Sequence, residues 1–254
     1  MTRRMICTLT VLCSAIGPVR AQDDPAKKPG GNADALDLLR KSQTALKKVE
    51  QVKYRGAFQG LGWVAEFVAQ VEGATVMGRQ SKYELDTFRS EVKLTPKGKT
   101  EPVEITVGSN GDVFFLIDPK TKTAYEDMDP AVLGSVGRDA QRLIMPVFGK
   151  ADPYGKELDP ESVELKGTET VGEVECQIVG IKGKEPPDLE WFIATTDYLP
   201  RRVRRLYPNQ RDPQGPPGTT ELTISDLVVN PKLDGDPFKL TVPEGFTKSD
   251  DFAP

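Results

Sequence analysis

Residues 189–207 read LEWFIATTDYLPRRVRRLY, and this stretch decides the fold of the 254-residue chain. Two strand-like runs flank the Leu-Pro pair at 199–200, which predicts a hairpin. A loop rich in proline and glycine follows at 208–218, and another strand-like run, TTELTISDLVVN, occupies 219–230. The chain then closes with DGDPFKLTVPEGF at 234–246. This order predicts antiparallel strands throughout the C-terminal third of the chain.

The middle of the chain also alternates with a period of two, which is typical of strands that bury one face. The strand-like runs are VKYRGAFQG (52–60), WVAEFVAQV (63–71), KYELDTF (82–88), SEVKL (90–94), VEITV (103–107), DVFFLID (112–118), ESVELKGTETV (161–171) and EVECQIVGI (173–181). Asn110-Gly111 separates two of these runs, and this pair is a strong signal for a hairpin turn. We therefore expect an antiparallel meander.

The N-terminal residues have the pattern of a secretory signal peptide at 1–21. Arg3 and Arg4 precede the short apolar run 5–16, and Ala21 is a suitable last residue before cleavage. The apolar run is too short to span a membrane, which takes about 20 residues. We expect an exported chain with no transmembrane segment after cleavage.

A polar leader rich in proline and glycine is expected at 22–32, and Asn32 can cap a helix that follows it. Apolar residues recur at helical spacing over 35–49, which predicts an amphipathic helix packed on a sheet. Loss of the signal peptide removes three of 34 basic residues and none of 38 acidic residues, so the net charge falls from −4 to −7. That charge argues against nucleic acid as a partner.

A second helical stretch is predicted in the middle of the chain. Asp129-Pro130 opens it, and apolar residues recur as far as Val147. Gly134 and Gly137 each weaken it by about 1 kcal/mol relative to alanine. A weakened apolar helix suits a movable cover or an irregular core helix, and both interpretations stay open.

The pattern as a whole predicts an α+β fold in one domain, residues 33–254. Helices segregated to one side of an antiparallel sheet define this class. About 10–11 strands tend to curl, so we expect a strongly curved antiparallel sheet in an open half-barrel. An N-terminal helix and a mid-chain helical lid complete the expected fold.

The sequence offers little catalytic chemistry. It holds no histidine, which removes the commonest general base and most zinc sites. The carboxylate pairs at 173/175 and 127/129 stand at predicted turns in an acid-rich chain, and we give them no catalytic role. The string GSVG at 134–137 lacks the spacing of a nucleophile elbow. We expect no enzymatic activity, no metal and no cofactor.

Only Cys176 remains once the signal peptide is removed, so no internal disulfide can form. In VECQI, Val174, Cys176 and Ile178 share one face of a predicted strand. We favour a buried thiol that acts as a small apolar side chain over a reactive one.

Five stretches, in order, resemble the periplasmic outer-membrane lipoprotein carrier superfamily, the LolA/LolB-like proteins. They are YRGAFQG (54–60), SNGDVFFLIDPKTKTAY (109–125), VGEVECQIVGIKGK (171–184), WFIATTDYLPRRVRR (191–205) and NPKLDGDPFKLTVPEGF (230–246). The resemblance covers most of the chain after residue 33. It implies a curved sheet, a helical lid, and a hydrophobic cavity between them that takes acyl chains.

This resemblance, together with strands rich in aromatic residues, suggests where a ligand would bind. The cavity candidates are Phe58, Trp63, Phe67, Phe88, Phe115, Leu143, Ile144 and Trp191. For any single one of these residues we favour an ordinary core position, and Phe114 and Phe115 must point to opposite faces of one strand. Burial of acyl chains among such residues gains about 0.8 kcal/mol per methylene group.

The basic run RRVRR supplies the candidates for contact with a lipid headgroup or a partner protein: Arg201, Arg202, Arg204 and Arg205. The plainer alternative is a solvated edge strand that its charges protect from aggregation. The leading hypothesis is a periplasmic lipid or lipoprotein acyl-chain binding protein, acting as a carrier or a sensor in the bacterial envelope. The alternative is a protein-interaction module with a filled barrel and no ligand.

Overall fold

The structure, a computed structural model, describes residues 32–79, 87–158, 162–209 and 212–250. The predicted signal peptide, nearly all of the predicted leader, and most of the predicted strand at 82–88 lie outside these residues. α1 spans Asn32–Leu46 and begins at the expected position. It ends three residues before the predicted boundary, because residues 47–49 form a turn that leads into the first strand.

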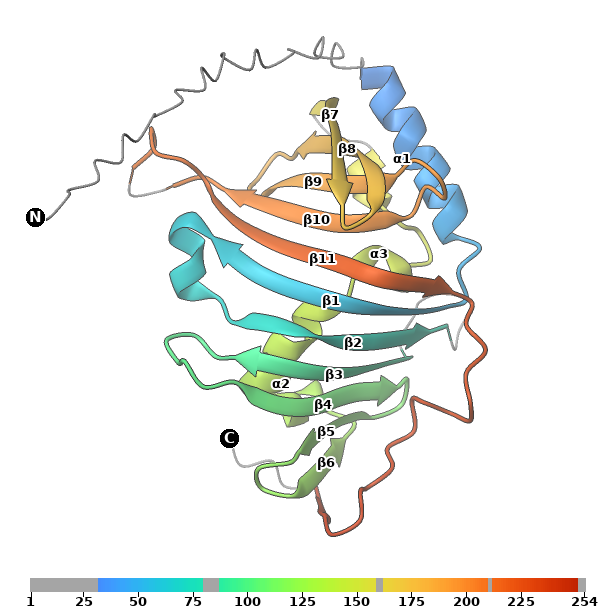
Figure 1. Cartoon of the computed structure of the whole chain (residues 1–254), viewed down its shortest axis with the longest axis vertical. Helices are drawn as coiled ribbons and strands as arrows, with labels where there is room; N and C mark the ends of the chain where they lie inside the picture. Colours follow the sequence, from blue (N-terminus) through green and yellow to red (C-terminus); the bar gives the residue numbers. More distant parts are fainter. Residues whose placement is uncertain (1–31, 80–86, 159–161, 210–211, 251–254) are drawn as a thin grey trace, which may run out of the picture.

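One open sheet forms the body of the described chain (Figure 1). Its strands are β1 Gln51–Leu61, β2 Gln70–Gly78, β3 Thr87–Thr95, β4 Val103–Asn110, β5 Phe114–Asp118, β6 Thr123–Asp127, β7 Ser162–Val171, β8 Val174–Lys182, β9 Asp188–Ala194, β10 Pro200–Tyr207, β11 Gly218–Val229 and β12 Thr247–Ser249. The order across the sheet is β12-β6-β5-β4-β3-β2-β1-β11-β10-β9-β8-β7. All neighbours are antiparallel except β12 and β6. This confirms the α+β open half-barrel; the short β12 was not predicted, and β2 shares only Gln70 and Val71 with a predicted strand.

The hairpin at Asn110-Gly111 is confirmed. β4 and β5 pair from Thr106 opposite Ile117 to Ser109 opposite Phe114. The Asn110 carboxamide oxygen accepts hydrogen bonds from the backbone N–H groups of residues 112 and 113, and Gly111 has a positive φ of 96°. A turn of this kind is fixed by its own residues, so the sequence reveals it directly.

The strand predicted at 63–71 is wrong except at its last two residues, because the chain forms the 3₁₀ helix η1, Gly62–Phe67, and β2 begins only at Gln70. Gly62 enters it with a φ of 63°, which breaks the strand. Close packing explains the compact turn: a Cβ atom on Gly60 would lie 2.6 Å from a Val68 methyl group. The alternation in this segment reflects one buried residue, Val64, rather than a buried face.

β10, which carries RRVRR, is not an edge strand. It pairs with β9 on one side and with β11 on the other. The two edges of the described sheet are β7 and β12. Edge protection therefore does not explain the arginines, which instead pair with carboxylates on other strands of the sheet.

The predicted mid-chain helix is a series of short helices on the concave face (Figure 1). They are η2 Pro130–Leu133, α2 Gly134–Ala140, η3 Gln141–Leu143 and α3 Pro146–Gly149. Gly134 has a φ of 55° with ψ of −162°, which interrupts the path, and Pro146 starts the last helix. We call residues 130–149 the lid. A fifth short helix, η4 Gly155–Leu158, follows it.

Most of the core lies between the lid, α1 and the concave face of the sheet. Two smaller clusters lie on the convex face. One consists of Val171, Cys176, Phe192 and Ala194, which confirms the buried Cys176 face. The other is Phe115 with Ile117 and Ala124, covered by residues of the C-terminal segment.

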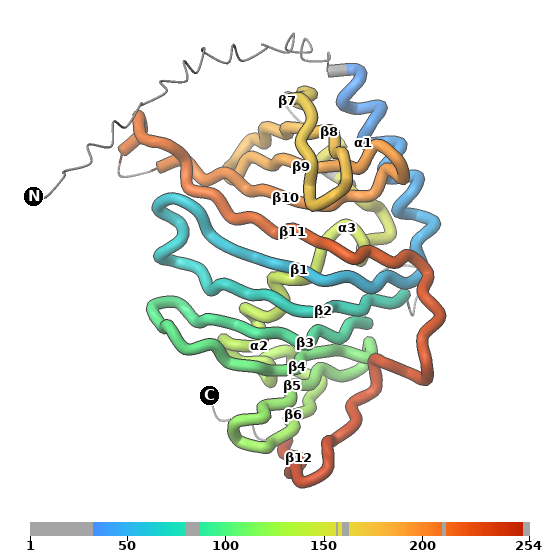
Figure 2. Tube along the Cα trace, in the orientation of Figure 1, coloured from blue at the N-terminus to red at the C-terminus, as the bar shows by residue number. Residues whose placement is uncertain are grey.

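That segment, residues 231–249, we call the strap. It leaves the central strand β11 and reaches the far edge of the sheet, where β12 pairs with β6 (Figure 2). Leu240, Val242 and Phe246 pack on the Phe115 cluster. Phe238 is 9% exposed, and its ring occupies the space where a side chain on Gly78 would lie.

Candidate functional site

The concave face and the lid form the candidate site, since they bring together most of the predicted cavity residues. Leu143 of the lid is fully buried and lies over Gly56 in the middle of β1. A Cβ atom placed on Gly56 would be 3.7 Å from the Leu143 Cβ atom. The missing side chain therefore lets the lid approach the sheet closely.

Tyr54 attaches the lid to the sheet. Its buried hydroxyl donates to the Leu143 carbonyl oxygen at 2.8 Å and accepts from the Met145 backbone N–H at 3.0 Å. Burial raises the Tyr54 pKa, so the hydroxyl stays protonated. Leu143 is the last residue of η3 and Met145 precedes α3, so no helical hydrogen bond satisfies either group. The Tyr54 side chain thus stabilises the irregular backbone between η3 and α3.

Trp191 forms the other end of the site, under α1 and η4. Its indole N–H donates to a Glu157 carboxylate oxygen at 2.6 Å, and its ring packs edge-on against Tyr154 with centroids 5.2 Å apart. The Tyr154 hydroxyl lies 2.7 Å from the Ser42 hydroxyl on α1. Burial raises the Glu157 pKa, while the Trp191 hydrogen bond and the charges of Lys150 and Arg205 oppose that rise.

The structure divides the predicted cavity residues into two groups. Phe58, Phe88, Leu143 and Trp191 are buried in the concave core, and Ile144 packs against that core. Trp63 and Phe67 are 38% and 45% exposed on η1, where their rings form an edge-on pair 5.9 Å apart. Phe115 lies on the convex face beneath the strap.

Large buried side chains occupy much of the concave core. The largest fully buried ones belong to Trp191, Tyr54, Tyr154, Phe115, Phe148 and Phe192, and only Phe115 and Phe192 lie outside it. Three pockets formed by the described residues open at the surface, and core residues line two of them: Phe58 and Val71 line one, and Val49 and Leu199 line another.

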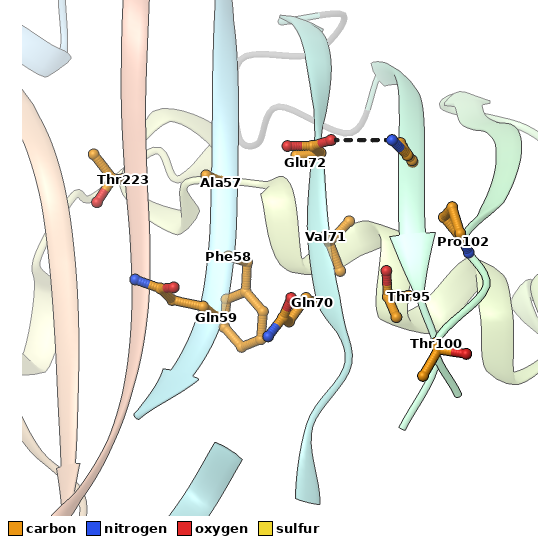
Figure 3. Close-up of a pocket in the computed structure, with 11 residues that line it drawn as sticks. Ala57, Phe58, Gln59, Gln70, Val71, Glu72, Thr95, Thr100, Pro102 and Thr223 are labelled. Carbon is orange, nitrogen blue, oxygen red and sulfur yellow. Dashed lines mark ion pairs between the residues drawn. The ribbon is translucent and has the colours of Figure 1, made fainter. Parts of the chain in front are cut away.

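One of these pockets, of about 430 Å³, lies over the centre of the sheet (Figure 3). Gln59, Gln70 and Thr95 line it together with Glu72 and Lys93, whose ion pair is long at 3.9 Å and exposed. The pocket is polar, and it has none of the character expected of an acyl-chain site.

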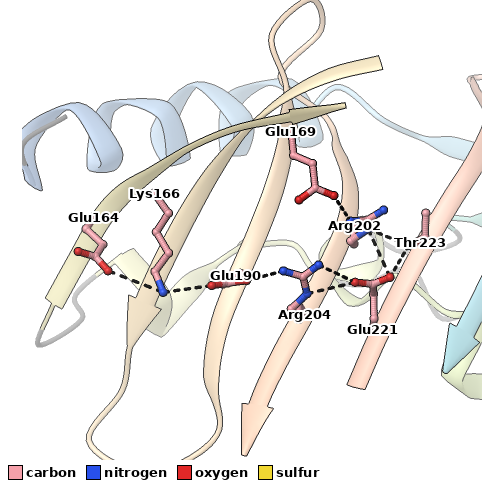
Figure 4. Close-up of polar contacts among 8 residues, drawn as sticks. All are labelled: Glu164, Lys166, Glu169, Glu190, Arg202, Arg204, Glu221 and Thr223. Carbon is pink, nitrogen blue, oxygen red and sulfur yellow. Dashed lines mark hydrogen bonds and ion pairs between the residues drawn. The ribbon is translucent and has the colours of Figure 1, made fainter. Parts of the chain in front are cut away.

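Arg202 and Arg204 of β10 take part in a chain of ion pairs on the convex face (Figure 4). Arg204 contacts Glu190 of β9 at 3.0 Å and Glu221 of β11 at 2.9 Å. Arg202 contacts Glu169 of β7 at 2.6 Å and donates to the Thr223 hydroxyl at 3.0 Å. Opposite charges on adjacent strands stabilise the sheet.

The remaining contacts complete this arrangement. Lys166 lies 3.1 Å from Glu190, and both Arg202 and Arg204 place their guanidinium groups 4.9 Å from the centre of the Phe192 ring. Arg201 is 8% exposed and contacts Asp197 at 2.6 Å. Arg205 makes no ion pair with any residue that the structure describes.

The Cys176 thiol is free and buried between the sheet and its convex-face neighbours. Burial raises its pKa to about 11, although Arg201 and Arg202 act in the opposite direction. A thiol with that pKa is a poor nucleophile at neutral pH.

Sequence analysis missed Tyr54, Glu157, Glu190 and Glu221. Tyr54 stands in an alternating run, where it looks like any core residue. The two β-strand glutamates alternate with apolar residues, which signals only an outward-facing position. Their pairing with Arg204 depends on strand order, which the local pattern does not contain.

The carboxylates weighed for catalysis have local roles or lie in solvent. Asp127 and Asp129 accept backbone N–H groups at the start of η2. Glu173 and Glu175 are exposed beside the β7–β8 turn. Within the described ranges, no His, Cys, Asp and Glu side chains gather as a metal site would require, and no helix there is long and apolar enough to cross a membrane.

Solved structures share this fold. LprF from Mycobacterium bovis is 12% identical, and the match covers 86% of this chain and 99% of that one, with a TM-score of 0.52. An uncharacterized conserved protein from Thermus thermophilus is 12% identical over 85% and 98% of the two chains, with a TM-score of 0.47. LppX from Mycobacterium tuberculosis is 13% identical over 80% and 99%, with a TM-score of 0.44.

No family model and no curated protein matches the sequence. The likeness to LprF, together with the open sheet and its covering helices, confirms the fold that the sequence predicts, a curved antiparallel sheet with helices on one side. At this level of identity the likeness shows the fold alone.

Proposed function

We propose that this protein is an exported, non-enzymatic carrier or sensor that binds a lipid or lipoprotein acyl chain between its sheet and its lid. The acyl chain would contact Phe58, Phe88, Leu143, Ile144 and Trp191. The proposed location is the periplasm, in keeping with the signal peptide predicted at 1–21.

The observation that carries the proposal is the construction of the lid. A broad apolar face is covered by short helices, broken at Gly134 and at Pro146, rather than by one continuous helix. The Tyr54 hydroxyl supplies the two hydrogen bonds described above between the lid and β1. Displacement of such a cover exposes apolar surface that an acyl chain can cover again at about 0.8 kcal/mol per methylene group.

Arg205 is the arginine best placed to meet a headgroup. The other three arginines of RRVRR already contact carboxylates. Arg205 acts on Glu157 electrostatically, so it lies toward the Trp191 end of the site. A phosphate or carboxylate headgroup there would place the acyl chain toward the lid.

A disulfide that locks the lid tests the proposal. Gly56→Cys with Leu143→Cys places two sulfur-bearing side chains where the Cβ atoms are 3.7 Å apart, close to the spacing of natural disulfides. The background is Cys176→Ala, so that no other described thiol competes. We expect the reduced protein to take up a fluorescent fatty acid and the oxidised protein to take up none.

The matched control is Gly56→Ser with Leu143→Ser, which should bind equally under both redox conditions. Equal uptake by the locked and the reduced protein would show that the ligand does not enter beneath the lid. Absence of uptake in both states and in the wild type, with no lipid found by mass spectrometry of the purified protein, would reject acyl-chain binding altogether.

The filled core favours one alternative, an interaction module without a ligand. Tyr54, Phe148 and Trp191 occupy the interior that a cavity would need. Under this alternative, the locked protein keeps its full activity toward a protein partner. The same locked variant therefore separates the two functions.

A further inference from the structure

A groove at the end of the sheet, separate from the candidate site, lies between α1, the β9–β10 turn and the end of β11. Its volume is about 840 Å³. Apolar residues lie along it, with Val49 and Leu199 buried and Tyr198 and Val229 each 37% exposed. Asn230 closes one end, because its side chain joins the exits of α1 and β11 through hydrogen bonds to residues 48, 50 and 51.

One side of β11 is unpaired beyond Thr223, and Val229 at the end of this strand lines the groove. It pairs with β1 from Leu61 opposite Thr219 to Val52 opposite Val229. It pairs with β10 only from Gly218 to Thr223. Among the described residues, no strand is registered with residues 224–229 on the β10 side, and a bulge opposite Lys53–Arg55, with Asp226 at a φ of 51°, interrupts this edge. An unpaired strand edge is a template for the backbone of another extended segment.

The rim of the groove is positively charged. Arg40, Lys41 and Lys48 are exposed and line it. Its two acidic residues are already paired, Asp37 with Lys41 at 2.8 Å and Asp197 with Arg201 at 2.6 Å. Arg40 and Lys48 make no ion pair with a described residue, so the groove keeps net positive charge in a chain whose net charge is −4. An acidic ligand complements it.

Tyr198 presents its ring to the groove from an unfavourable backbone conformation. Its φ is 59°, in the left-handed region where a bulky residue costs about 1–2 kcal/mol. Lys41 places its ammonium group 5.9 Å from the ring centre. Glycine would adopt this positive φ without strain. A large aromatic residue therefore occupies a position that the backbone conformation of the turn disfavours.

We propose that this groove binds an extended, acidic peptide segment of a partner protein, which adds to the free edge of β11. In an extended strand alternate side chains point to opposite sides. Acidic residues at every second position would face Arg40 and Lys48, and apolar residues between them would contact Tyr198 and Val229. The free strand edge favours a peptide over a lipid surface. This inference stands apart from the acyl-chain proposal.

Fluorescence anisotropy with labelled octapeptides tests it. One probe alternates glutamate and valine, a second alternates lysine and valine, and a third repeats the first with N-methyl groups on alternate backbone nitrogens. We expect the glutamate probe to bind and the lysine probe to bind at least tenfold more weakly. N-methylation should also remove binding, because it removes the backbone donors that pair with β11.

Charge reversal locates the binding to the groove. Arg40→Glu with Lys48→Glu should weaken the glutamate probe at least tenfold. Lys53→Glu with Arg55→Glu, on the exposed face of β1, is the matched control and should change the affinity less than twofold. Tyr198→Gly should weaken binding severalfold while the melting temperature stays equal or rises.

Three outcomes would overturn the proposal. The first is failure of the wild-type protein to bind the glutamate probe, and the second is binding that both charge-reversed proteins retain equally. The third is a different occupant: self-association, or adsorption to phosphatidylglycerol vesicles, that the groove variants abolish while peptide binding is absent. Self-association would identify a second copy of the chain as the occupant, and vesicle adsorption would identify a membrane surface.

Discussion

At the scale of single residues, the sequence predicts contacts between chain neighbours but not contacts between residues that strand order brings together. The turn at Asn110-Gly111 involves only neighbouring residues, and the sequence predicts it correctly. Arg204 pairs with Glu190 and Glu221, which are 14 and 17 residues away. No local pattern selects those partners, because strand order brings them together. The burial of Cys176 was predictable, since alternation alone places it on an apolar face of its strand.

Glu157 provides a prediction at this scale. Its pKa is higher in the folded protein, chiefly because of burial, so the folded state binds more protons than the unfolded state above the ordinary value of 4.5. The contribution of Glu157 to stability therefore falls as the pH rises through that region. Glu157→Gln keeps an oxygen for the Trp191 indole and removes the buried charge. We expect a higher melting temperature than wild type at pH 7.5 and a similar one at pH 4.

Thermal unfolding of both proteins between pH 4 and pH 8 checks this expectation. Glu185→Gln, at an exposed loop position, is the matched control. A difference between wild type and Glu157→Gln that is constant over this range would contradict the proposed burial of the charge.

At the scale of elements, the sequence predicts where helices and strands occur better than it predicts their continuity. The mid-chain apolar stretch was placed correctly, yet it folds as four short helices. Gly134 and Pro146 mark the breaks, and their effect depends on contact with the sheet. The basic strand β10 lies inside the sheet rather than at its edge, because Glu190 and Glu221 of the neighbouring strands and Glu169 of β7 neutralise its charges.

Tyr54→Phe tests the lid as an element. The change leaves the Leu143 carbonyl and the Met145 N–H of the lid without their buried partner. An unsatisfied buried group costs about 1–3 kcal/mol, so we expect lower stability and a lid that opens more often. Uptake of a fluorescent fatty acid should therefore be faster, which stopped-flow fluorescence can measure.

Tyr207→Phe is the control for this prediction. Tyr207 is half-buried at the end of β10, and its hydroxyl makes no hydrogen bond with a described residue. Loss of stability in Tyr54→Phe without any change in the uptake rate would argue that the lid is a fixed part of the core.

At the scale of the whole molecule, the predicted fold class is correct, and the strap is the feature that the sequence did not reveal. Its segment was recognised as the last part of the fold by resemblance alone. Nothing in its residues shows that it reaches from β11 to the opposite edge of the sheet, where β12 joins β6. The sequence predicts that Phe114 and Phe115 lie on opposite faces of β5. It does not predict that the strap covers Phe115.

Deletion of residues 231–254 tests the role of the strap. It removes Phe238 and Phe246 and uncovers Phe115 and Ile117, and each buried aromatic or aliphatic side chain contributes about 1.5–3 kcal/mol. We expect a lower melting temperature, stronger binding of an apolar dye, and concentration-dependent association through the exposed edge of β6. Analytical ultracentrifugation and dye fluorescence measure these effects.

Lys239→Ala with Glu244→Ala alters only exposed residues of the strap and is the control. A truncated protein that stays monomeric, with unchanged dye binding, would show that the strap is dispensable for the fold.

The pairing of β1 with β11 also sets the time at which this protein can fold during synthesis. The central strands of the sheet come from residues 51–61 and 218–229, near opposite ends of the chain. A nascent chain on the ribosome cannot complete the middle of the sheet until almost the last residue of β11 has emerged. Pairing across such a long separation is also intrinsically slow. A polypeptide built in this way stays unfolded for most of its synthesis, as passage through a translocation channel requires.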